Sequence, residues 1–131
     1  MIRPLLSALI FLTQIFHPGL LQGDIVDSLS TLFKSANSKE ISKIFSPSVE
    51  LTINEEEDVY TKAQAERILR EFFTKNAPVN STVVHLINTN PNYRFGILSL
   101  STKNAKFRVA ITLKKTVNTF FITELRIEPD K

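Results

Sequence analysis

Residues 61–78 carry the clearest helix pattern in the chain and constrain the fold more than any other stretch. Thr61 can cap the N-terminus, and Gln64 three residues later can complete a capping box. The apolar residues fall on one stripe at helical spacing: Ala65, Ile68, Leu69, Phe72 and Phe73. Two adjacent phenylalanines on that stripe need a large apolar surface to cover them. We therefore expect this helix to pack across a sheet, with both rings in the core rather than around a ligand.

The residues before this helix predict two shorter helices and one strand. Apolar side chains at helical spacing predict a helix over residues 24–36. Asn37 and Glu40 can form a second capping box, which opens a short helix with Ile41, Ile44 and Phe45 on one side. Alternation over residues 49–53 predicts a half-buried strand, and the acidic residues 55–58 are expected in a solvated turn.

From residue 81 onward the apolar period is two, as in strands. The pattern predicts strands over residues 81–88, 93–102, 106–114 and 119–128. Short polar connections favour antiparallel neighbours. Gly96 inside a strand predicts a bend or bulge, and therefore a strongly curved sheet. The predicted fold class is α+β, with a curved antiparallel sheet (a four-strand C-terminal meander plus one early strand) packed against about three helices.

Two of the predicted strands are apolar on both faces. In the first, Val84 and Leu86 point one way while Val83 and Ile87 point the other, and the second alternates in the same manner. A sheet covered by helices on one side only would expose one of these sets as an apolar patch. We expect a second copy of the chain to cover it, giving a homodimer through the outer sheet face. The alternative is that a remnant of the N-terminal segment covers it.

The first 23 residues have the layout of a secretory signal peptide. Arg3 precedes an apolar run over residues 5–16, which is too short to span a bilayer as a helix, and a less apolar tail follows. We expect cleavage after Gly23, export to the periplasm or medium, a single domain over residues 24–131, and no stable membrane span after cleavage. An uncleaved anchor or a buried first helix is the alternative. Loss of Arg3 lowers the formal net charge from +3 to +2, which does not indicate a nucleic-acid partner.

The chain resembles a family of small exported bacterial proteins called domain of unknown function 4783, within the nuclear transport factor 2-like superfamily. The resemblance rests on residues 49–53, 60–66, 72–73, 107–109 with 113–115, and 125–128. It implies a cone-shaped fold of this superfamily and export, and it implies no activity. A glycine is common in the last turn of the family, whereas Thr116, Val117 and Asn118 stand there in this chain, so that hairpin is expected to differ.

Three side chains are candidates for a ligand site. The superfamily includes isomerases, dehydratases and cyclases that work in the pocket of the cone, so His85 is a possible general base. Tyr60, just before the helix over residues 61–78, could donate a hydrogen bond to a ligand. Arg108 shares a strand face with Lys106 and Lys114, where an anionic group could bind. Each has an ordinary structural reading as well: a strand histidine hydrogen-bonded at the sheet face, a packed tyrosine, and an edge cation that discourages strand pairing.

The sequence offers no metal or cofactor site. It contains no cysteine and, after cleavage, one histidine, so a zinc site is not expected. The acidic residues 55–58 lack the spacing of a calcium loop. No catalytic residue is assigned. The favoured function is a non-catalytic exported domain that binds a small apolar ligand or a protein partner. The alternative is an isomerase-like or dehydratase-like enzyme that uses His85 and Tyr60.

Overall fold

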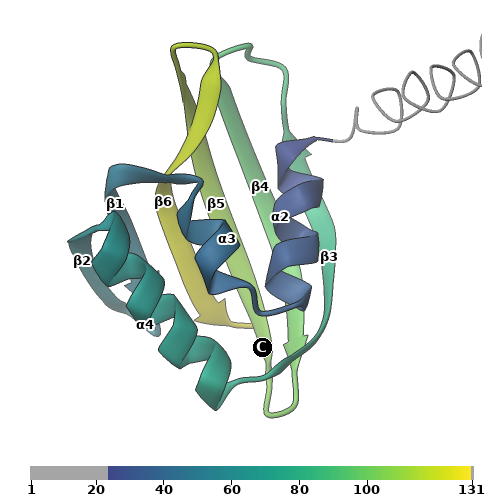
Figure 1. Ribbon diagram of the computed structural model, residues 1–131. Coiled ribbons are helices and arrows are strands. Elements are labelled where there is room, and N and C mark those ends of the chain that lie inside the picture. Colours follow the sequence, from purple (N-terminus) through teal and green to yellow (C-terminus); the bar gives the residue numbers. More distant parts are fainter. Residues whose placement is uncertain (1–23, 131) are drawn as a thin grey trace, which may run out of the picture.

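The computed structural model describes residues 24–130, in which three helices cover one face of a single six-stranded sheet (Figure 1). The signal-peptide prediction for residues 1–23 lies outside this range. The elements in chain order are α2 (Ile25–Lys34), α3 (Ser38–Ser42), β1 (Phe45–Ile53), β2 (Glu56–Thr61), α4 (Lys62–Lys75), β3 (Pro78–Ile87), β4 (Tyr93–Thr102), β5 (Lys106–Thr116) and β6 (Thr119–Pro129). None of the helices described is both long and apolar enough to cross a membrane.

Helix α4 confirms the prediction for the stretch that begins at Thr61. The Gln64 amide donates to Thr61 Oγ1 at 3.2 Å, and the Thr61 amide donates to Gln64 Oε1 at 3.0 Å, so the capping box is complete. The Phe72 ring lies edge-on to Phe107 of β5, with 5.0 Å between ring centroids. The Phe73 ring lies edge-on to Phe33 of α2, with 5.7 Å between ring centroids. Both rings are buried. They join α4 to the sheet and to α2. Both belong to the core, and Phe72 also lines a cavity beside α4.

The sheet order is β2-β1-β6-β5-β4-β3, which confirms the antiparallel meander of the last four strands. The prediction that the whole sheet is antiparallel was wrong in one pair, because β1 lies parallel to β6, with Leu51 beside Leu125. Alternation along a strand shows which face is buried but carries no information on its neighbour or direction. This parallel pair joins the β1–β2 hairpin to β6, the last strand of the meander.

Two predicted boundaries in the early part of the chain were wrong. The predicted turn over residues 55–58 is shorter and starts one residue earlier. Asn54 and Glu55, with φ of 52° and 74°, form the whole connection between β1 and β2, and residues 56–58 belong to β2. Positive φ at both central positions is typical of a type I′ hairpin, so one early strand becomes a hairpin of two. Phe45 does not end a helix but begins β1, where it is buried and paired with Ile122.

The apolar faces of β3 also differ from the prediction. A register shift between Val83 and His85 places an extra residue in β3, which reverses the alternation beyond it. Val83 and Leu86 therefore both pack against the core, while Val84 and Ile87 are 60% and 41% exposed. Of the bend or bulge expected at Gly96, the bulge was wrong, because Gly96 lies in a regular ladder between Leu86 and Ile111.

Candidate functional site

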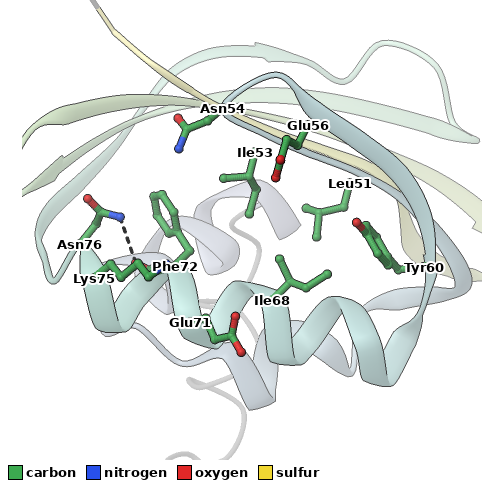
Figure 2. Close-up of a pocket in the computed structure, with 10 residues that line it drawn as sticks. All are labelled: Leu51, Ile53, Asn54, Glu56, Tyr60, Ile68, Glu71, Phe72, Lys75 and Asn76. Carbon is green, nitrogen blue, oxygen red and sulfur yellow. Dashed lines mark hydrogen bonds between the residues drawn. The ribbon is translucent and has the colours of Figure 1, made fainter.

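A cavity of about 230 Å³ lies between α4 and the β1–β2 hairpin (Figure 2). Its apolar lining comes from Leu51 and Ile53 of β1 and from Ile68 and Phe72 of α4. These side chains point into the space between helix and strands because they occupy the inward positions of both elements. Ligand pockets usually range upward from about 300 Å³, and an apolar cavity of about 150 Å³ can hold benzene. This cavity therefore suits one small molecule of the size of a substituted ring.

Polar groups surround the cavity: Asn54, Glu56, Tyr60, Glu71, Lys75 and Asn76. Figure 2 shows Glu56 and Tyr60 reaching from the hairpin, with Glu71 and Lys75 on the helix. The Asn76 side-chain amide is already engaged, since its Nδ2 donates to the Phe72 carbonyl at 3.2 Å. Six of the ten lining residues are therefore polar. In small-molecule sites apolar burial gives affinity and polar groups fix orientation, and this cavity offers both.

The structure separates the three candidate residues named from the sequence. Tyr60 is half-buried and lines the cavity. His85 is exposed on β3, where it pairs with Ile97 and lies edge-on to Phe95 at 6.4 Å between ring centroids. Gly96, between those two partners, faces α2. His85 therefore lies on the sheet face that the helices leave uncovered, and it cannot meet Tyr60 over one ligand in this arrangement.

Arg108 lies on the same uncovered face as His85. Its neighbours in the chain, Phe107 and Val109, are core residues, so the arginine side chain points the other way and is exposed. The cavity therefore contains one of the three candidates, and the outer sheet face contains the other two.

Sequence reasoning missed two carboxylates at the cavity, Glu56 and Glu71. Glu56 was assigned to a turn. It lies four residues before Tyr60, so in a strand both side chains point to the same face, and this spacing was the available signal. Glu71 lies directly beside the apolar stripe of α4, and the helix pattern alone gave it no role at a site. Among residues 24–130 no group of three or more potential metal-binding side chains is arranged to hold an ion.

The sequence profile described as "Domain of unknown function (DUF4783)" matches residues 26–128, which is nearly all of the described chain. No curated protein matches significantly. Among solved structures, a DUF4783 family protein from Bacteroides ovatus is 33% identical, with a TM-score of 0.75 over 79% of this chain and 93% of that one. A second, from Bacteroides uniformis, is 27% identical, with a TM-score of 0.78 over 82% of this chain and 99% of that one.

A more distant match shows the fold alone. The protein described as "Rd1NTF2_04 with long sheet" is 14% identical and has a TM-score of 0.62 over 78% of this chain and 94% of that one. The similarity extends over whole domains, so the chain has the nuclear transport factor 2-like architecture that the sequence predicted, with a curved sheet and helices on one side.

Proposed function

The chain belongs to the DUF4783 family, and from that starting point we propose that it is a non-catalytic domain that binds one small, largely apolar molecule between α4 and the β1–β2 hairpin. The observation that carries the proposal is the cavity itself, which has an apolar interior and polar groups around it. Elsewhere in the core, large side chains such as Phe33, Phe45 and Leu69 are fully buried.

The position of His85 argues against the catalytic alternative that pairs it with Tyr60. An isomerase or dehydratase needs an acid or base within hydrogen-bond reach of the bound substrate. His85, the base named for that role, lies on the opposite face of the sheet from Tyr60. The polar groups around the cavity are suited to orienting a ligand through hydrogen bonds, and binding alone requires nothing more.

We further propose that residues 1–23 are removed during export, so that the binding domain acts outside the cytoplasm. The charge and apolar pattern of that segment supports the proposal. Expression in a bacterial host, followed by intact mass measurement of the periplasmic fraction, tests it directly. A mature chain that begins at Asp24 is expected, and full-length protein retained with the cells would overturn it.

Methyl-resolved NMR titration with indole and phenol tests the binding proposal. Saturable shifts confined to Leu51, Ile53 and Ile68 are expected, because their methyl groups line the cavity. Ile68→Phe should fill the space and abolish those shifts. Arg67→Phe places the same ring at the neighbouring exposed position and should leave them intact. Thermal melting confirms that both variants fold. Absence of shifts at millimolar probe, or equal shifts in the two variants, would contradict the proposal.

A further inference from the structure

We propose that the sheet face away from the helices docks a second copy of this chain, through contacts between two oppositely charged parts of that face. The first part, the acidic patch, consists of Glu50, Glu57, Glu124 and Glu128 on β1, β2 and β6. The second, the basic strip, consists of Lys106, Arg108 and Lys114 on β5. In the dimer the basic strip of each copy contacts the acidic patch of the other. This surface lies across the sheet from the helices (Figure 1) and is independent of the cavity.

The acidic patch is short of positive charge within one copy. Glu50 of β1 stands directly beside Glu124 of β6 in the ladder, and like charges in that position repel. Arg126 is the one cation that reaches the patch among the described residues, at 3.4 Å from Glu128, 3.9 Å from Glu124 and 4.0 Å from Glu57. A hydrogen bond to Glu57 and the nearby charge of Glu124 raise the pKa of Glu50. Arg126 thus pairs with three of the four carboxylates, and the fourth, Glu50, has no ion pair among the described residues.

A buried hydroxyl lies within the acidic patch without a hydrogen-bond partner. Thr52 lies between Glu57 of β2 and Arg126 of β6 in the ladder. Its neighbours Leu51 and Ile53 point into the cavity, so Thr52 points to the outer face. The residue is 1% exposed, and within residues 24–130 its Oγ1 has no partner. A buried polar atom left unpaired is unfavourable, and a hydrogen-bond donor that reached Thr52 Oγ1 in the dimer would satisfy it.

The basic strip, in contrast, lacks negative charge within one copy. Its three side chains alternate along β5 with buried Phe107, Val109, Ile111 and Leu113, so they point to the outer face, where all three are exposed. In the part of the chain described, none of them has a carboxylate oxygen within 4.0 Å, even though Arg108 stands beside Glu128 in the ladder. Unpaired cations and uncompensated carboxylates therefore occupy adjacent strands of one face.

Apolar side chains on the same face complete the surface. Ile87 and Phe95 stand side by side on β3 and β4, and Val84 protrudes from the bulge of β3. A two-fold dimer brings one surface against itself, so that surface must be complementary to itself. A face that carries both charge signs meets this condition. A partner that is only basic or only acidic would leave half of the charged groups unpaired, so a second copy fits this face better.

Sedimentation equilibrium with charge-reversed variants tests the proposal. One variant carries Lys106→Glu, Arg108→Glu and Lys114→Glu; the other carries Glu50→Lys, Glu57→Lys and Glu124→Lys. The mature wild-type domain should dimerise in the micromolar range, and less strongly in high salt because exposed charges are screened. Each variant alone should be monomeric, because its two charged parts then have the same sign. An equimolar mixture should recover a heterodimer.

The matched control reverses Lys62 and Arg67 on the exposed face of α4 (Lys62→Glu with Arg67→Glu) and should leave the dimer intact. Circular dichroism checks folding, and single reversals at Arg108 and Glu124 replace any triple variant that does not fold. A wild-type domain that stays monomeric at hundreds of micromolar would overturn the proposal. So would variants that dimerise as well as wild type, or a mixture of folded variants that fails to associate.

Discussion

Val26 of α2 packs so closely on Gly96 of β4 that a Cβ added at residue 96 would lie 2.5 Å from Val26 Cγ1. Val26 is fully buried, and the helix start around it is fixed. Asp24 Oδ1 accepts from the Val26 amide at 3.0 Å, and Asp24 Oδ2 accepts from Arg94 Nε at 3.0 Å. Arg94 is two residues before Gly96 on the same strand. Glycine is needed at residue 96 for close approach of the helix, not for a bulge in the strand.

Gly96→Ala is therefore expected to destabilise the domain by about 1–3 kcal/mol, the usual cost of forcing extra volume into a packed core. Urea unfolding measures the loss. Val26→Ala removes the contacting methyl groups, so the double variant should be more stable than the sum of the two single losses implies. Ser99→Ala on the outer face of the same strand should have little effect. Additive losses at residues 26 and 96 would contradict the contact.

The hairpin between β5 and β6 contains an unfavourable residue at Val117. Val117 and Asn118 form the turn with φ of 49° and 68°. A β-branched residue is rarely found in the left-handed region, which costs an L-residue about 1–2 kcal/mol. Val117 is 88% exposed, so its side chain contributes little packing that a substitution would remove.

We expect Val117→Gly to raise the free energy of unfolding by about 1 kcal/mol, because glycine adopts positive φ without strain. Thermal or urea unfolding provides the measurement. Val59→Gly is the matched control, since Val59 is also exposed, at 62%, but lies inside a strand, where glycine should destabilise. A loss of stability in both variants would show that the turn is not strained.

A hydrogen bond between side chains fastens α3 to α4. Ser38 Oγ donates to Glu66 Oε2 at 2.8 Å, and Ser38 is 6% exposed. The other oxygen of the same carboxylate, Glu66 Oε1, accepts from Arg70 Nη1 at 2.9 Å. Hydrogen bonds to charged groups contribute about 1.5–3 kcal/mol. Ser38→Ala should therefore lower the free energy of unfolding by about that amount in urea titrations.

Ser42→Ala is the control for this bond, because Ser42 is in the same short helix but bonds only to the Lys39 carbonyl on the exposed side. Its effect should be a few tenths of a kcal/mol. Equal effects at Ser38 and Ser42 would mean that the link between the helices contributes nothing beyond local helix preferences.

Local signals predicted most of the elements, and contacts distant in sequence explain what they missed. The capping box at Thr61 defines the start of α4, and the period-two pattern gives the bounds of β4 to the residue. The parallel placement of β1 beside β6 has no local signature, because it depends on which surfaces remain free after the meander forms. The bulge at Val84 is similarly a product of pairing with β4.

The candidate site was less accessible from sequence for the same reason. Tyr60 was identified, but its partners Leu51 and Ile68 come from separate elements, and only the packed hairpin creates the space between them. His85 and Arg108 are exposed because their side chains point to the sheet face that the helices do not cover (Figure 1). For His85 the bulge decides the face, so counting alternate residues could not place it.

The acidic patch gives a pH-dependent prediction at Glu50. The groups that face Glu50 are Glu57, Glu124 and the more distant cation Arg126, and the hydrogen bond to Glu57 is the largest cause that raises its pKa above the ordinary value of 4.5. The folded state therefore binds this proton more tightly than the unfolded state. Between 4.5 and the raised pKa, the contribution of Glu50 to stability falls as pH rises, because ionisation then adds repulsion to the native patch.

Glu50→Gln should remove this contribution. In urea unfolding at a series of pH values, the stability of the variant relative to wild type should increase as pH rises above 4.5 and then level off. Glu57→Gln should make the free energy of unfolding depend less on pH in this window, because the substitution removes the main cause of the raised pKa of Glu50. A constant difference between Glu50→Gln and wild type across this window would show that the Glu50 carboxyl titrates alike in the folded and unfolded chains.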